Sequence, residues 1–200
     1  MSSTSPSKPT NRRLTREDWT AEALRALRGG GLSAVAIEPL AARLGATKGS
    51  GYWHFRGRDD LIAATVARWE AEHTEAVIAH VESEAAAIDR LRELLRVVLG
   101  HVGPFTVELA LLASADHPLV APTLRRVTRR RIDYLAGLFT ELGFDAERAR
   151  RRALLAYTTY LGHAQLARTA PDELPTAGRE RQVYLESVLA ALVAPEGGPR

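Results

Sequence analysis

The 200-residue sequence contains no cysteine. Disulfide frameworks, cysteine-ligated zinc sites and thiol catalysis are therefore excluded, because each of them needs a thiol. The absence is consistent with a reducing cytoplasm but leaves the compartment open.

Long apolar runs are absent as well. The longest uncharged stretch, residues 153–167, spans fifteen residues and includes Tyr, Thr, His and Gln. It falls short of the roughly 20 apolar residues that a membrane-spanning helix needs. Residues 1–11 are polar and lack the apolar segment of a secretory signal. We therefore expect a cytoplasmic protein without a membrane partner.

The sequence also lacks the residue patterns of an enzyme or a metal site. Its six histidines include no pair at the i, i+4 spacing that metal sites on helices use. No nucleophile-elbow motif or paired-carboxylate arrangement is present. The order Lys48-Gly49-Ser50 is wrong for a phosphate-binding P-loop, and no strand pattern precedes it. We predict no catalysis, no metal ion and no cofactor.

Positive charge is concentrated in the first quarter of the chain. Residues 1–58 carry ten basic and four acidic side chains, a net charge of +6, whereas the other 142 residues carry a net charge of −3. Such an asymmetry is typical of a polyanion-binding module in front of a body with another role. On charge alone, a solvated basic face is the alternative.

Apolar residues recur with helical periodicity along nearly the whole chain, and no alternating strand pattern is found. We predict an all-α fold of about nine helices. The first helix is expected at residues 16–28, because Thr15 and Asp18 resemble a capping box and three glycines follow. The other expected helices cover residues 37–44, 48–55, 59–80, 88–102, 104–113, 119–142, 146–167 and 178–192.

Residues 40–55 have the spacing of a helix-turn-helix. Ala41 allows two short helices to cross closely, and Gly45 supplies the turn between them. Leu40, Tyr52 and Phe55 hold the two helices together through apolar contacts, and Phe55 is expected to be a core residue. In such a unit the second helix lies in the major groove of DNA.

The stretch LAARLGATKGSGYWHF at residues 40–55, followed by RDDLI at residues 58–62, resembles the N-terminal domain of the TetR family of transcriptional regulators. The resemblance covers about residues 14–70, and the C-terminal half is similar only in length and helical character. It implies a homodimer that binds a palindromic operator in double-stranded DNA. It also implies a body that binds an unknown small-molecule effector, most often in a repressor.

The resemblance sets the expected domain organisation. Residues 12–58 form the helix-turn-helix domain, and a helix at about residues 59–80 connects it to the body. Residues 81–195 form the ligand-binding and dimerisation domain. Residues 1–11 are expected to be a disordered arm, and residues 196–200 a flexible tail.

The resemblance also implies which residues contact DNA. The residues nearest the base edges would be Lys48, Ser50 and Gly51, and after them Trp53. The side chains that donate hydrogen bonds to phosphates would be those of Thr47, Tyr52 and His54. The N-terminus of their helix also favours anions. Arg58 stands where the family usually has lysine. Further backbone contacts are expected from Arg12, Arg13 and Arg16.

Two positions depart from the family pattern. Gly51 replaces a large apolar residue, and Ala36 replaces a hydroxyl residue. A glycine inside a helix costs about 0.5 to 1 kcal/mol relative to alanine and removes a packing contact. We therefore expect a looser recognition helix, and at Ala36 the loss of a helix cap and a phosphate contact.

The body offers a dimer face and a ligand pocket. The predicted dimer face combines small and aromatic residues of the last two helices: Ala156, Tyr157, Tyr160, Ala164, Val188 and Leu192. The alternative for this face is an intramolecular core. The predicted pocket between the middle helices is lined by His101, Phe105, Glu108, Tyr134, Thr158 and His163, because such pockets are mostly apolar with a few polar groups.

The sequence therefore predicts a ligand-responsive DNA-binding regulator, acting as a repressor. The alternative is a helical small-molecule-binding or interaction protein with degenerate DNA binding.

Overall fold

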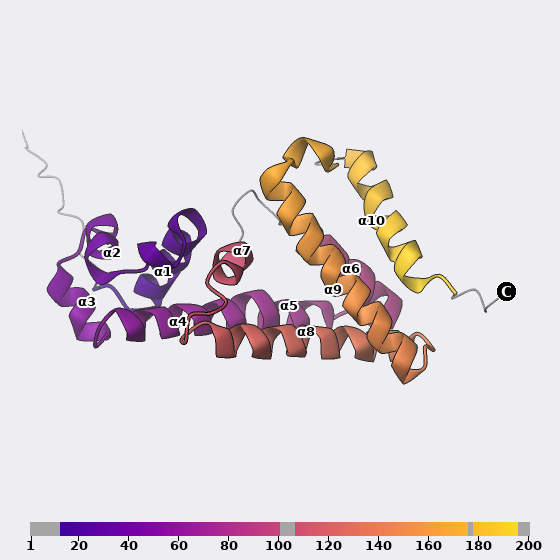
Figure 1. Ribbon diagram of the computed structural model, residues 1–200, viewed down its shortest axis with the longest axis horizontal. Helices are drawn as coiled ribbons and strands as arrows, with labels where there is room; N and C mark the ends of the chain where they lie inside the picture. Colours follow the sequence, from indigo (N-terminus) through magenta and orange to yellow (C-terminus); the bar gives the residue numbers. More distant parts are fainter. Residues whose placement is uncertain (1–12, 101–106, 176–177, 196–200) are drawn as a thin grey trace, which may run out of the picture.

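The computed structural model describes residues 13–100, 107–175 and 178–195 (Figure 1). Within these ranges every regular element is a helix, which confirms the all-α prediction. The elements are α1 (Arg16–Gly30), η1 (Leu32–Ala34), α2 (Ile37–Leu44), α3 (Lys48–His54), α4 (Arg58–Glu70), η2 (Ala71–Glu75), α5 (Ala76–Val81), α6 (Ala87–Gly100), α7 (Val107–Leu112), α8 (Ala121–Glu141), α9 (Ala146–Thr169), η3 (Pro171–Glu173) and α10 (Gly178–Val193).

A local capping sequence sets the start of α1, and a glycine sets its end. Thr15 Oγ1 accepts a hydrogen bond from the Asp18 N–H at 3.2 Å, and Asp18 Oδ2 accepts one from the Thr15 N–H at 2.8 Å. This capping box starts α1 where predicted. The helix ends two residues later than predicted, because the chain first leaves it at Gly31, whose φ is +65°.

The predicted helix at residues 59–80 is one continuous helix made of α4, η2 and α5 (Figure 1). Its middle is a π turn, in which the Ala76 N–H donates to the Ala71 carbonyl five residues earlier. Such wide turns are rare and are often found at functional sites. Counted this way, the described ranges contain nine helices. The predicted helix at residues 104–113 lies partly outside the described residues, and its described part is α7.

Two hydrophobic cores lie along this long helix. The first joins α1 to α4 with α7 and the beginning of α8, around the fully buried rings of Trp19 and Trp69. The second joins α6, the rest of α8, α9 and α10 around Phe139. Figure 1 shows α8 running beside α4 and α5, with α7 between the first core and the body. Side chains beyond residue 81 therefore help to form the core of the N-terminal unit.

Gly51 lies at the point where the recognition helix α3 meets α1 and α2. Gly51 is buried, and a Cβ atom added to it would lie 2.5 Å from Ile37 Cγ2 and 2.9 Å from the Trp19 ring. The indole of Trp19 therefore fills space that a large side chain at position 51 would need. The looser packing expected at Gly51 is not found, because the lost volume is supplied from α1.

We expect Gly51→Ala to destabilise the protein. Overpacking a core costs about 1 to 3 kcal/mol, which exceeds the gain in helix propensity of about 1 kcal/mol. Urea unfolding followed by circular dichroism measures the change in the free energy of unfolding.

The matched control is Gly49→Ala in the same helix, where a Cβ would meet only Thr47 Oγ1 at 3.8 Å. This control should gain about 0.5 to 1 kcal/mol. Combining Gly51→Ala with Trp19→Phe should cost less than the sum of the two single changes. Equal stabilisation by alanine at both glycines would contradict the close packing at Gly51.

Candidate nucleic-acid interface

The outer face of α3 carries most of the side chains predicted to contact DNA. Lys48 and Thr47 are exposed at its start. Tyr52 is 51% exposed and Trp53 is 68% exposed, unusually high values for aromatic side chains. Thr47 Oγ1 accepts from the Ser50 N–H at 3.2 Å and so caps the helix. Tyr52 and Trp53 point outward beside Lys48, so they contribute little to the hydrophobic core. Such exposed aromatic side chains are typical of a binding surface.

Gly51 is the one predicted contact on the inner face of α3, packed against Trp19 and Ile37. We therefore leave it out of the DNA-contacting set. Phe55, at the end of the helix, is 1% exposed and is a core residue, as expected.

His54 and Arg16 connect α3 to the helices around it. His54 Nε2 is 2.9 Å from the Leu14 carbonyl oxygen. Arg16 donates to the His54 carbonyl and, at 2.9 Å, to Asp60 Oδ1, while its guanidinium lies over the Phe55 ring. Hydrogen bonds from Arg16 and the Arg56 backbone N–H hold the pKa of the Asp60 carboxyl below its usual value. The pairing of Asp60 with Arg16 could not be predicted from the sequence, because the two residues are 44 positions apart.

Arg58 contacts the chain segment in front of α2. Its Nε donates to the Val35 carbonyl at 3.0 Å, and one terminal nitrogen donates to the Leu32 carbonyl at 2.8 Å. The guanidinium thereby fixes the start of α4 to the turn that leads into α2. Ala36 is the N-cap residue of α2 and gives it no side-chain hydrogen bond, as expected.

One more basic side chain, that of Arg13, flanks the recognition helix. The Arg13 guanidinium lies 4.3 Å from the centre of a Trp53 ring, a cation–π geometry. It therefore adds positive charge next to the exposed face of α3. Arg12 lies outside the described residues.

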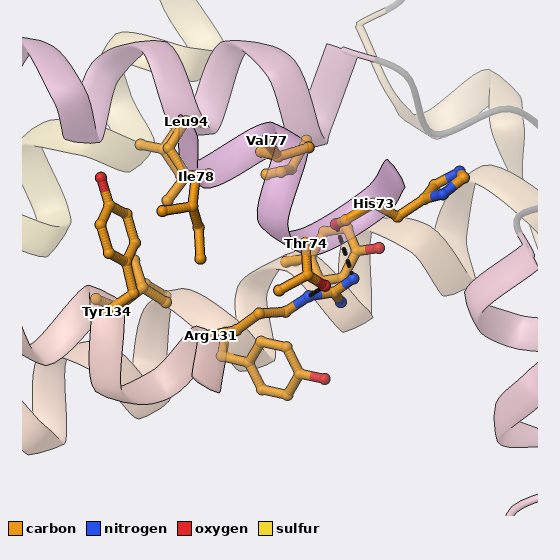
Figure 2. A pocket seen from close by; sticks show the side chains of 13 residues that line it. His73, Thr74, Val77, Ile78, Leu94, Arg131 and Tyr134 are labelled. Atoms are coloured by element: carbon orange, nitrogen blue, oxygen red, sulfur yellow. Dashed lines mark hydrogen bonds between the residues drawn. The ribbon is translucent and has the colours of Figure 1, made fainter. Parts of the chain in front are cut away.

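The body contains a small cavity between four helical elements. Its volume is about 70 Å³, and most of its wall is apolar. Figure 2 shows Val77, Ile78 and Leu94 on one side, facing Tyr134 and Arg131 on the other. The remaining lining residues are His73, Thr74, Leu95, Val98, Leu135, Ala156, Tyr157 and Tyr160.

Of the six predicted ligand contacts, Tyr134 lines this cavity. Thr158 is exposed, and its hydroxyl donates to carbonyls of its own helix. His163 is buried beside Tyr184, with 3.2 Å between His163 Nδ1 and the Tyr184 hydroxyl. His101 and Phe105 lie outside the described residues.

Glu108, the sixth candidate, belongs to a buried polar cluster at one end of the cavity, here called the Arg131 network. Arg131 donates to Glu108 Oε2 at 2.7 Å, to Thr74 Oγ1 at 2.9 Å and to the His73 carbonyl at 3.0 Å. The dashed lines in Figure 2 mark the last two contacts.

Two phenols complete the Arg131 network on the side of α9. The Tyr160 hydroxyl donates to Glu108 Oε2 at 3.1 Å, and the Tyr157 hydroxyl donates to Oε1 at 3.4 Å. Burial and then the Glu108 charge raise the pKa of both phenols, so that they keep the protons they donate. Sequence reasoning missed Arg131, because it is one of several arginines in a row.

The predicted dimer face lies mostly inside the chain. Ala156, Tyr157, Ala164 and Leu192 are buried in the monomer, and Ala156 and Tyr157 also line the cavity. These residues pack intramolecularly, which is the alternative that the sequence left open. The other two, Tyr160 and Val188, are partly buried against the same second core.

The opposite side of the last two helices is apolar and exposed. On α9, Leu155 is 49% exposed, and Thr158, Gly162 and Leu166 follow it along the same exposed face. On α10, Val183 is 57% exposed and is followed on its own face by Ser187 and Ala190. Apolar exposure repeated at helical spacing is typical of a contact surface.

Among residues 13–100, 107–175 and 178–195, no cluster of His, Asp or Glu has the arrangement of a metal site. Over the same ranges, none of the helices combines the length and apolar character needed to span a bilayer.

Comparison with known proteins identifies the family of the N-terminal helix-turn-helix unit, α1 to α4, here called the head. Residues 20–65 match the sequence model of the bacterial regulatory proteins of the tetR family. This match covers α1 to α4, including the recognition helix. No curated protein matches the chain.

Solved structures match over nearly the full length. A TetR transcriptional regulator from Legionella pneumophila is 18% identical, with 92% of this chain and 97% of that chain covered and a TM-score of 0.73. A transcriptional regulator from Rhodococcus sp. Rha1 is 21% identical, with coverage of 90% and 94% and a TM-score of 0.71. AibR in complex with isovaleryl coenzyme A and operator DNA is 19% identical, with coverage of 90% and 99% and a TM-score of 0.63.

The sequence match and the structural matches agree on the same architecture of a helix-turn-helix head followed by a helical body. The N-terminal domain of this chain therefore matches the tetR family of bacterial regulatory proteins, and the chain as a whole has the fold of the solved regulators.

Proposed function

We propose that the protein is a ligand-responsive transcriptional regulator that binds a palindromic operator as a homodimer, most simply as a repressor. The observation that carries this proposal is the outer face of α3, where Lys48, Tyr52 and Trp53 are exposed on a head whose sequence has a net charge of +6. A helix of this kind fits the major groove, and DNA supplies the negative charge. Such a target would place the protein in the cytoplasm.

The exposed residues divide into two kinds of DNA contact. Lys48 and Ser50, near the N-terminus of α3, are proposed to reach base edges, with Trp53 beside them. Thr47 and Tyr52 are proposed to donate to phosphates. His54 and Arg58 make hydrogen bonds to backbone carbonyls within the head. Their proposed role is therefore mainly to hold α3 and α4 in position for the contacts of their neighbours.

A second copy of the chain is the proposed partner of the exposed face on α9 and α10. An isologous dimer needs a patch that meets itself, and small residues such as Gly162 and Ala190 let helices approach closely. Two heads joined in this way can contact two half-sites in successive major grooves. The dimer face is therefore proposed at Leu155, Thr158, Gly162, Leu166, Val183, Ser187 and Ala190.

The cavity beside the Arg131 network is the proposed effector site. It is enclosed mostly by apolar side chains with polar groups at one end, as ligand pockets are. Among the structural matches, AibR has been solved with a coenzyme A ester and operator DNA together. We propose that effector and operator here favour different arrangements of the heads, so that each weakens binding of the other by the same factor. The division into a DNA-binding head and an effector-binding, dimerising body is part of this proposal.

An alternative function is that of a helical binding protein whose DNA affinity is weak and indifferent to sequence. The packed Gly51 and the capped α3 favour the regulator, because they hold the recognition helix in a defined position.

The first test of the proposal is DNA binding by variants of α3. Tyr52→Ala should weaken binding about fivefold or more on all duplexes, because a phosphate contact carries no sequence information. Lys48→Ala should also lower the ratio of specific to random binding, since a base contact contributes about 1 to 3 kcal/mol of discrimination. Fluorescence anisotropy measures both effects on a duplex that the protein has selected from a random pool and on a random duplex.

Arg148→Ala, on α9, is the matched control for loss of one positive charge and should leave both affinities unchanged. An unaltered protein that selects no sequence would contradict the base-reading role of Lys48. The same conclusion would follow if both α3 variants changed specific and random binding equally.

The second test is the oligomeric state. Leu155→Asp should convert the dimer to a monomer, because a carboxylate would be buried without a partner at the contact. Sedimentation equilibrium measures the change, and circular dichroism checks that the helices remain. The control Leu112→Asp alters an exposed leucine on α7, outside the proposed face, and should stay dimeric. A dimer that survives Leu155→Asp and Leu166→Asp together would place the interface elsewhere.

A further inference from the structure

The polar end of the body cavity is closed by charges that already neutralise one another. Glu108 is 3% exposed, and its carboxylate accepts from the Arg131 guanidinium and from two phenols. The guanidinium in turn donates to Glu108, Thr74 and the His73 carbonyl. A buried ion pair with its hydrogen bonds satisfied presents no unmatched charge to a neighbouring molecule.

The charge balance decides which ligands the cavity favours. A ligand carboxylate would lie near Glu108 without a cation of its own, and a ligand ammonium would lie near Arg131 without an anion of its own. Each would have to be desolvated without compensation, which is costly in an apolar site. Burial lowers the pKa of His73, the other titratable group beside the network, so this imidazole remains neutral near pH 7. A neutral molecule avoids these costs.

The apolar wall indicates the rest of the ligand. Val77 and Ile78 of α5, Leu94 and Val98 of α6, and Leu135 of α8 surround the space. The cavity of about 70 Å³ is smaller than the roughly 150 Å³ cavity that is known to take up benzene in another protein. A ligand with one ring therefore has to displace part of the wall. Because α8 and α9 pack along each other extensively, we expect the wall to open by a shift of α5 and α6.

Arg131 is hydrogen-bonded to the helix that such a movement would shift. Its contacts to Thr74 and to the His73 carbonyl lie in the π turn η2, between α5 at the cavity and α4 in the head. Its guanidinium also lies 5.3 Å from the centre of a ring of Trp69, in the core of the head. Its partner Glu108 is in α7, which packs on α1. The Arg131 network therefore contacts the cavity and, through Trp69, the core of the head, while α7 connects it indirectly to α1.

We propose that the cavity binds a small neutral, largely apolar molecule, and that the Glu108–Arg131 pair couples its occupancy to α4 through the π turn at Ala71–Glu75. This inference rests on the proposed function, since it names the chemistry of the proposed effector. Arg131 acts as a positioning residue, because its donors bind Thr74, Glu108 and the His73 carbonyl rather than the ligand.

The ligand class is tested on the protein without DNA. Benzyl alcohol, benzoate and benzylamine have similar size and differ in charge at pH 7. Calorimetric titration is expected to give a dissociation constant for benzyl alcohol at least tenfold lower than for either ion. Tighter binding of benzoate or benzylamine, or no binding of benzyl alcohol, would overturn the proposed ligand class.

A cavity-filling variant locates the binding site. Val98→Phe should abolish benzyl alcohol binding while circular dichroism remains unchanged. Binding that survives in a folded Val98→Phe protein would place the site elsewhere. If this variant does not fold, the charge selectivity of the unaltered protein still decides the ligand class.

The coupling is tested with paired substitutions that leave no unpaired buried charge. Glu108→Leu with Arg131→Met removes the buried pair between α7 and α8, and the control Glu75→Leu with Arg130→Met removes an exposed pair between η2 and α8. The measurement is the affinity for the selected DNA duplex with and without saturating benzyl alcohol. The unaltered protein and the exposed-pair control should show a change of at least about fivefold, and the buried-pair variant less than twofold.

Coupling that is retained in the buried-pair variant, or absent from a DNA-binding unaltered protein, would overturn the role of Arg131. A protein that binds benzyl alcohol selectively but selects no DNA would instead contradict the proposed function and leave the ligand class supported.

Discussion

The buried guanidinium of Arg131 is the contact on which the arrangement of head and body depends. It lies on α8 and reaches α7 through Glu108, the long helix through Thr74 and His73, and the first core through Trp69. With Arg131 removed, Glu108 would be left charged in an apolar surrounding, at a cost of about 3 to 5 kcal/mol. One side chain with several simultaneous partners therefore links the two cores.

Stability alone does not explain such a network. Well-packed apolar residues often replace a buried ion pair without loss of stability, and sometimes with a gain. What an apolar replacement does not supply is a directional bond to the backbone carbonyl of His73 in the π turn. A directional contact fixes the rotation and register of the long helix, which matters for a protein whose head has to point in a defined direction.

The head uses its positive charge in two different ways. Arg43 and Arg25 pair with the buried carboxylate of Glu22, and Arg16 pairs with Asp60. Arg43 thereby joins α2 to α1 and Arg16 joins α1 to α4, whereas the Arg25 pair lies within α1. The net charge of the head, which the sequence shows clearly, therefore overstates the charge on its outer face. Lys48, the exposed Arg56 and Arg13, which lies over Trp53, place charge next to the recognition surface.

Features that depend on neighbouring residues could be predicted from the sequence. The helix starts at Thr15 and Thr47 and the turn at Gly45 follow from caps and backbone geometry within a few positions. The cavity and the dimer face could not be predicted in the same way, because periodicity reveals two faces of α9 but not which one the chain covers. Ala156 and Ala164 are covered by the chain itself, whereas Leu155 and Leu166 are exposed.

Gly51 shows why a departure from a family pattern has to be weighed against distant residues. In the sequence it is a missing side chain, while in the fold it is a contact surface for the ring of Trp19, 32 positions earlier. A large ring from α1 and a glycine in α3 together fill the volume that a small and a large residue would fill in the opposite order. Because the indole is rigid and fully buried, this exchange holds α3 firmly against α1. The outward side of α3, which carries Lys48, Tyr52 and Trp53, is consequently presented from a packed base.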